Sequence, residues 1–129
     1  MAISATLVFL DMDHIEFRVW DPLSLANCIV NLFDCDASEP SKSGTVMVNL
    51  LMGPTIELKK ADVNHPVCGS VIALDVRDNQ AVIEFLCKKG IEPNLSLIGG
   101  DGNGPIFFSV AHRNDKIDFH TIIKGGKPW

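Results

Sequence analysis

The fold is set by the segment Met12-Asp13-His14-Ile15-Glu16-Phe17-Arg18-Val19-Trp20-Asp21, because its pattern returns at residues 71–78, "VIALDVRD". Both copies alternate apolar and polar residues, which is the period of a half-buried strand. Three apolar positions and the closing Asp match at a constant offset of 57 residues. His14 is the chemically distinctive residue of the first copy, and Val71 stands at its position in the second.

Each copy leads into a predicted helix. Asp21 and Asp78 are typical N-cap residues, and Pro22 suits a first helical position. After Asp21 one apolar face is formed by Leu25, Cys28, Ile29 and Leu32, at i, i+3, i+4 and i+7, and the helix is expected to end near Phe33. The second helix has an apolar face of Val82, Phe85 and Leu86 and a C-terminal stop at Gly90.

Two predicted β-hairpins complete the repeat. The first joins residues 45–51 and 55–59, and the second joins 106–111 and 116–123. Ile117-Asp118-Phe119 matches Ile56-Glu57-Leu58 at an offset of 61. Residues 34–44 read as a mobile loop or a poor edge strand, and 95–98 as a short strand. We therefore predict one α+β domain over 1–129, with modules at about 12–60 and 70–123, an extra N-terminal strand at 5–10 within 1–11, and a tail at 124–129.

Composition narrows the class of protein. The chain has 129 residues, 47% hydrophobic and 21% charged, which suits one compact core. Its net charge of −5 and scattered Lys and Arg argue against a nucleic-acid or membrane partner. The apolar runs are shorter than the ~20 residues of a membrane span, and the first residues do not resemble a signal peptide, so a cytoplasmic location is expected. Four cysteines without a C-x-x-C pair predict buried thiols in a reducing compartment.

The repeat resembles the vicinal oxygen chelate superfamily, which includes glyoxalase I, bleomycin-resistance and extradiol dioxygenase proteins. The resemblance covers residues 12–123 and is carried by "MDHIEFRVWDPLSLA", "GPTIEL" and "IALDVRDNQAVIEFLCKKGIEP". It implies two βαβββ modules whose curled, mostly antiparallel sheet forms a cup around a small-molecule site. It also implies a homodimer, with each cup built within one chain or across two.

Metal-using members of that superfamily take ligands from the first and last strand of each module. Carried over, those positions are His14, Glu57, Val71 and Asp118. His14 and Glu57 are of the usual ligand types, Asp118 replaces a usual Glu, and Val71 replaces a common His and has no donor atom. His120 shares a strand face with Asp118 and offers a substitute for the absent His.

Two functions follow from the resemblance. In a metal-dependent lyase, isomerase or dioxygenase, His14, Glu57 and Asp118 would hold one Fe, Mn, Ni or Zn ion that polarises neighbouring substrate oxygens, with Glu57 or Asp118 as ligand or base. In a metal-free binding protein, the cup would hold a small molecule with His14, Arg18 and Glu57 as polar anchors. Val71 favours the second, a binding protein with a degenerate metal site; a purely structural or regulatory remnant is a third possibility.

Each candidate residue also has an ordinary structural interpretation. His14 would pair with Glu16 or Glu57 as a strand histidine, and Glu57 with Lys59 or Arg18. Asp118 and His120 would be solvated strand residues. The remaining expectations concern burial: His65 and His112 in exposed turns, Phe17 and Trp20 in the core.

Overall fold

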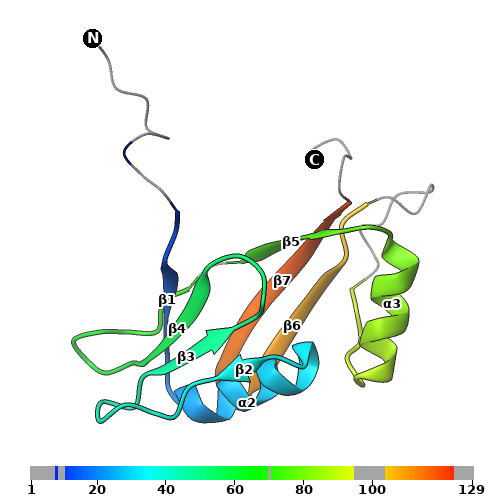
Figure 1. Cartoon of the computed structure of the whole chain (residues 1–129). Helices are drawn as coiled ribbons and strands as arrows, with labels where there is room; N and C mark the ends of the chain where they lie inside the picture. Colours follow the sequence, from blue (N-terminus) through cyan, green and yellow to red (C-terminus); the bar gives the residue numbers. More distant parts are fainter. Residues whose placement is uncertain (1–7, 9–10, 70, 95–103, 124–129) are drawn as a thin grey trace. The chain divides into compact units, whose positions relative to one another are not determined.

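The computed structural model describes residues 8, 11–69, 71–94 and 104–123. The chain divides into two compact units, Met1–Val67 (unit 1) and Cys68–Trp129 (unit 2). Each unit combines a mixed β-sheet with a helix, as Figure 1 shows. The predicted α+β class and its two-module plan are confirmed.

Unit 1 follows the predicted order of elements. They are β1 (His14–Val19), α2 (Pro22–Phe33), β2 (Asp36–Ala37), β3 (Val46–Asn49) and β4 (Thr55–Lys60). The sheet order is β1-β4-β3-β2, with β1 parallel to β4 and the other pairs antiparallel. β1 is therefore an edge strand of this sheet, directly beside the strand that carries Glu57.

Helix α2 forms as its sequence predicts. The Asp21 carboxylate accepts the Ser24 N–H at 3.1 Å, which satisfies one of the free donors of the first turn. Leu25, Ile29 and Leu32 are buried, whereas Cys28 is half-buried. The apolar side chains of β1, β3 and β4 complete this core, among them Phe17, Val19, Val46, Val48, Ile56 and Leu58. The alternate positions of β1 and β4 therefore point away from α2.

The strand that the sequence barely indicates in 34–44 is present as β2. It has only two residues, Asp36 and Ala37, which pair with Asn49 and Val48 at the edge of the sheet. The Ser38 N–H continues the pairing by donating to the Met47 carbonyl at 2.8 Å. A short polar edge strand buries little surface, so its sequence carries no strong strand pattern.

Unit 2 contains β5 (Ile72–Val76), α3 (Asn79–Lys88), β6 (Phe107–His112) and β7 (Asp115–Ile123). Its sheet order is β5-β7-β6, with β5 parallel and β6 antiparallel to β7. Asn94 forms an isolated bridge with Phe107. The strand expected at 95–98 and the tail at 124–129 lie outside the described residues. Of the strand expected at 5–10, only Val8 is described, and its backbone is helical.

A polar network ties α3 to β7 inside unit 2. Asp78 caps the helix by accepting the Ala81 N–H at 2.7 Å. Asn79, which is buried, donates to the Gly104 carbonyl at 2.7 Å. The Thr121 hydroxyl of β7 donates to Asn79 Oδ1 at 3.5 Å and accepts the Ile106 N–H at 3.0 Å. Burying these polar groups is tolerated because each has a partner.

Several burial expectations are wrong. Trp20 is 51% exposed, because β1 ends at Val19 and the chain turns there toward α2, whereas Phe17 is buried as predicted. Cys35 is buried as predicted, and that burial raises the pKa of its thiol. Cys68 and Cys87 are exposed instead, and all four cysteines are free thiols. His65 is exposed as predicted, whereas His112 is half-buried at the end of β6.

Among the described residues, we find no helix with the length and apolar character that crossing a bilayer requires.

Candidate functional site

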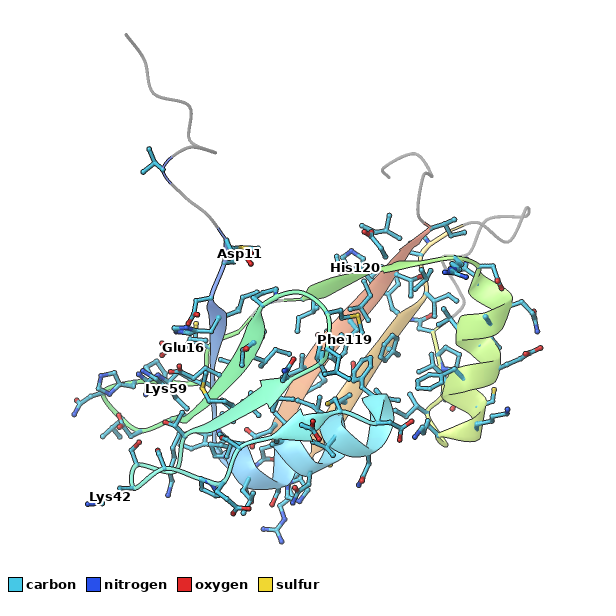
Figure 2. The ribbon with its side chains drawn as sticks, viewed as in Figure 1. Asp11, Glu16, Lys42, Lys59, Phe119 and His120 are labelled. Carbon is cyan, nitrogen blue, oxygen red and sulfur yellow. The ribbon has the colours of Figure 1, made fainter. Side chains whose placement is uncertain are left out.

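The candidate site of unit 1 lies on the sheet face that points away from α2. Strand alternation places His14, Glu16 and Arg18 of β1 there, beside Glu57 and Lys59 of β4. Figure 2 labels Glu16 and Lys59 on this face. The same alternation sends Phe17, Val19, Ile56 and Leu58 into the core, whereas Ile15 near the start of β1 is 39% exposed. The first strand of the module and its last strand therefore present one continuous row of ionisable groups.

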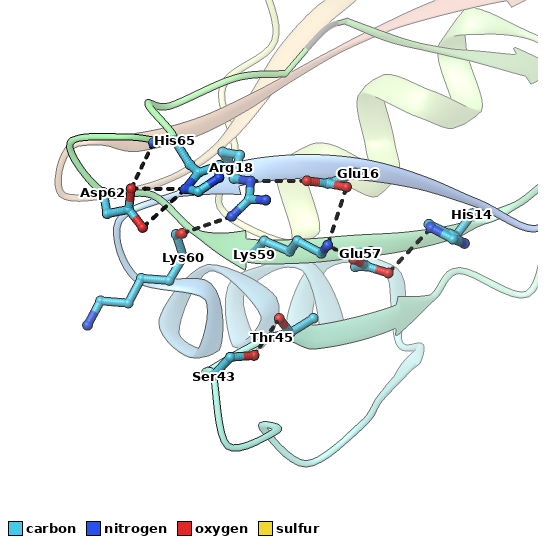
Figure 3. Close-up of polar contacts among 10 residues, drawn as sticks. All are labelled: His14, Glu16, Arg18, Ser43, Thr45, Glu57, Lys59, Lys60, Asp62 and His65. Atoms are coloured by element: carbon cyan, nitrogen blue, oxygen red, sulfur yellow. Dashed lines mark hydrogen bonds and ion pairs between the residues drawn. The ribbon is translucent and has the colours of Figure 1, made fainter.

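His14 lies between two carboxylates. Its Nδ1 is 2.8 Å from Asp13 Oδ2. Its Nε2 is 3.4 Å from Glu57 Oε2, a contact that Figure 3 shows. When Nδ1–H donates to Asp13, a neutral ring turns its Nε2 lone pair toward Glu57. The contact with Glu57 is then favourable only if Nε2 carries a second proton or a cation lies beside it.

The pKa of His14 is raised above its ordinary value near 6.5, chiefly by the hydrogen bond to Asp13 and further by the negative charges of Glu57, Asp13 and Glu16; desolvation opposes the rise. Protonated His14 therefore favours the folded state below pH 6.5, and this contribution disappears as pH rises through the raised pKa.

We expect Asp13→Asn to move the pKa of His14 downward, because the neutral amide removes the strongest stabilising contact of the imidazolium. An NMR titration of the His14 ring signals measures this directly. Asp11→Asn is the matched control, since the Asp11 carboxylate accepts the Met12 backbone N–H instead. An equal pKa in wild-type and Asp13→Asn protein would contradict the assignment.

The second oxygen of Glu57 is held by Lys59. Lys59 Nζ lies 3.2 Å from Glu57 Oε1 and 3.5 Å from Glu16 Oε2. Arg18 continues the row, with Nε 3.0 Å from Glu16 Oε1 and Nη1 donating to the Lys60 carbonyl at 3.4 Å. Of the pairings considered from the sequence, His14–Glu57 and Glu57–Lys59 are present, and Arg18 pairs with Glu16. Figure 3 shows the resulting alternation of charges.

The sheet face of unit 2 carries the other candidate residues, Asp118 and His120 on β7. Ser109 Oγ donates to Asp118 Oδ1 at 2.5 Å, and Lys116 Nζ lies 3.5 Å from the same oxygen. The His120 ring packs against Phe107, with centroids 5.6 Å apart and the planes tilted by 48°. Both residues are half-buried rather than fully solvated.

The strand registers revise how the two repeats correspond. In unit 1 Ile15 pairs with Ile56 and Glu16 with Glu57. In unit 2 Ile72 pairs with Phe119 and Ala73 with His120. Residues of β1 and β5 that correspond are 57 positions apart. With these strand pairings, corresponding residues of β4 and β7 are 63 positions apart, not the 61 suggested by the sequence. His120, not Asp118, is the structural counterpart of Glu57. A two-residue shift leaves every side chain on the same face, so the apolar pattern alone does not reveal it.

Two donors of unit 1, His14 Nε2 and Glu57 Oε2, have the spacing that a divalent ion requires. Two ligands of one tetrahedral ion, at bonds of about 2.1 Å, are about 3.4 Å apart, which equals the His14 Nε2–Glu57 Oε2 distance. Asp13 contacts the other ring nitrogen of His14, as carboxylates that orient metal-binding histidines do. His14 and Glu57 thus fit a metal as a pair. Within the described part of the chain, no group of three or more His, Cys, Asp or Glu residues has a metal-holding arrangement.

Sequence reasoning missed several participants. Asp13 was available from position alone, because it adjoins His14. The Glu57–Lys59 pair was considered from the sequence, but the contact of Lys59 with Glu16 depends on the β1–β4 register. Ser109 gives no such signal, since only the β6–β7 register places it opposite Asp118. Val71, immediately before β5, is 47% exposed and offers no donor, as its side chain predicts.

Comparison with known proteins addresses the fold. No family model and no curated protein matches the chain. A possible glyoxalase from Bacillus cereus superposes with a TM-score of 0.63 at 9% identity, covering 88% of this chain and 99% of that one. A variant of the fosfomycin resistance protein FosX from Listeria monocytogenes, complexed with Mn(II) and 1S,2S-dihydroxypropylphosphonic acid, gives 0.60 at 19%, with coverages of 88% and 90%. The oxidase ChaP-H2 gives 0.58 at 12%, with coverages of 93% and 95%. At these identities the likeness shows the fold alone: this chain has the glyoxalase-like fold, which its internal repeat predicted.

Proposed function

We propose that the chain is a small-molecule-binding protein of the glyoxalase and bleomycin-resistance type with a degenerate metal site. The observation that carries this proposal is the composition of the unit 2 sheet face that bears Asp118 and His120. There Val71 stands where metal-using relatives commonly have His, and the two residues that flank His120 on the neighbouring strands, Ala73 and Phe107, are small or apolar.

The unit 2 face combines apolar surface with few polar groups. Register places Ala73 beside His120 on β5, and Phe107 beside it on β6. Ala111 lies opposite Lys116 on the same face. Small-ligand sites have this character: apolar walls supply most of the contact area, and a few polar side chains fix the orientation. Asp118 and His120 are the orienting groups that unit 2 offers; unit 1 offers His14, Arg18 and Glu57.

We expect Phe107→Ala to weaken ligand binding at least tenfold, because it removes the aromatic ring against which His120 packs. Binding is measured on metal-free protein with benzoate, benzyl alcohol and methylphosphonate, by titration of amide chemical shifts in β6 and β7. Phe85→Ala is the matched control, since it removes an equal ring from the surface of α3. Absence of saturable shifts with all three probes, or equal losses in both variants, would contradict the proposal.

A second candidate function is a metal-dependent lyase, isomerase or dioxygenase. It is favoured by the 3.4 Å His14–Glu57 contact and by Asp13 behind His14, and by the Mn(II) complex of the FosX neighbour. A bound ion would polarise neighbouring substrate oxygens. His14 and Glu57 would hold it, and Asp13 would keep the Nε2 lone pair of His14 directed at it. For this function, His14→Ala should abolish the uptake of one metal ion per chain while the circular dichroism spectrum stays unchanged.

We also propose a homodimer in the cytoplasm, following the family resemblance and the acidic, cysteine-containing composition. Light scattering after size exclusion should give twice the 14.1 kDa chain mass; a mass of one chain would contradict the dimer.

A further inference from the structure

We propose that Lys59 is a built-in cation which occupies the Glu16–Glu57 carboxylate pair and thereby excludes a divalent metal ion from unit 1. The inference rests on the proposed degenerate metal site and gives a cause for it that is separate from Val71. Its basis is the position of one ammonium group between two carboxylates on neighbouring strands.

The β1–β4 register places like charges opposite each other. Glu16 is the direct partner of Glu57, and Arg18 is the direct partner of Lys59. Parallel neighbours lie about 4.8 Å apart, so two facing carboxylates repel each other unless a cation lies between them. Lys59 supplies it diagonally, 3.2 Å from Glu57 Oε1 and 3.5 Å from Glu16 Oε2.

Removing this ammonium would free Glu16 Oε2 and Glu57 Oε1 on the face that also carries His14, while Arg18 Nε would stay beside Glu16 Oε1. Among the described residues no three such donors already have a metal-holding arrangement, so these side chains would have to rotate toward a shared ion. Glu57 already has one oxygen directed at His14 Nε2, and Glu16 faces Glu57 across the ladder. An imidazole and two carboxylates on adjacent strands are donors that suit Mn(II) or Zn(II). Lys59 holds one oxygen of each carboxylate, and its charge also repels an approaching dication. Glu57 has only 12% of its side chain exposed, so solvent screens the Lys59–Glu57 contact incompletely.

The test is titration of purified full-length protein with Mn²⁺ alone, followed by calorimetry and by paramagnetic broadening of amide signals. Lys59→Met keeps the length and the apolar stem of the side chain but removes its charge. We expect it to bind Mn²⁺ about 10- to 100-fold more tightly than wild type, as removal of a unit charge a few ångströms from a dication predicts. Broadening should centre on β1 and β4.

Three variants isolate the effect. Lys60→Met removes an equal charge from the next residue of β4, which is exposed and on the opposite face, and should leave the Mn²⁺ affinity within about twofold of wild type. Lys59→Arg keeps the charge and should also stay near wild type. Lys59→Met combined with Glu16→Gln should lose the gain, because it removes the second carboxylate.

The proposal is overturned if Lys59→Met and Lys60→Met bind Mn²⁺ equally, or if the gain survives Glu16→Gln. Should Lys59→Met be unfolded without metal, refolding on addition of Mn²⁺ supports the proposal and failure to refold contradicts it. This test distinguishes failure of the Lys59 proposal from failure of the proposed function. If wild type binds Mn²⁺ tightly and Lys59→Met binds it equally well, Lys59 does not exclude the ion, and the metal-dependent enzyme is favoured. Weak binding by both proteins refutes only the role of Lys59.

Discussion

Phe119→Ala should lower the free energy of unfolding by about 3–5 kcal/mol, the largest loss expected from a single substitution in unit 2. The Phe119 ring is fully buried and stacks on Phe108, with ring centroids 5.1 Å apart and planes 9° from parallel. Alanine would leave a cavity between β6 and β7 and remove this aromatic contact. Urea denaturation followed by circular dichroism measures the loss.

The control for this prediction is Phe85→Ala, which removes the same ring from a position on α3 that is 38% exposed. We expect a loss below about 1 kcal/mol there, since surface substitutions leave little cavity. Comparable losses from the two variants would show that the core of unit 2 is not centred on Phe119.

Leu25→Ala should destabilise unit 1 by about 2–5 kcal/mol. Leu25 is fully buried on the face of α2 that packs against the sheet, so truncation removes contacts and leaves a cavity. Leu23→Ala is an unusually close control, because it makes the same substitution in the same helix at a side chain that is 45% exposed. Its expected loss is under about 1 kcal/mol; equal losses would mean that α2 packs through a different face.

Much of the fold is readable from the sequence because it rests on local chemistry. Asp21 and Asp78 cap their helices, Gly90 has a positive φ of 74° after α3, and β1 buries the alternate residues Phe17 and Val19. Each of these features depends on residues a few positions apart. The pattern at 12–21 therefore predicts both the first strand and the helix that follows it.

The site is less readable because it depends on pairing between distant strands. The β1–β4 register brings His14 next to Glu57. The β5–β7 register makes His120, instead of Asp118, the counterpart of Glu57. A shift of two residues changes neither the alternation nor the buried face, so no local pattern distinguishes the two registers. Trp20 was misplaced for a simpler reason: an aromatic residue at a strand end resembles a core residue in sequence.

The central claim is a small-molecule-binding protein with a degenerate metal site, and elemental analysis tests it most directly. Protein is purified without chelator, and its Fe, Mn, Ni and Zn contents are measured before and after dialysis against EDTA. The account predicts well under one ion per chain before dialysis, and it predicts that any of the three probes that binds does so equally well after dialysis. About one ion per chain that survives purification and is absent from His14→Ala would contradict the account and make the metal-dependent enzyme the correct interpretation.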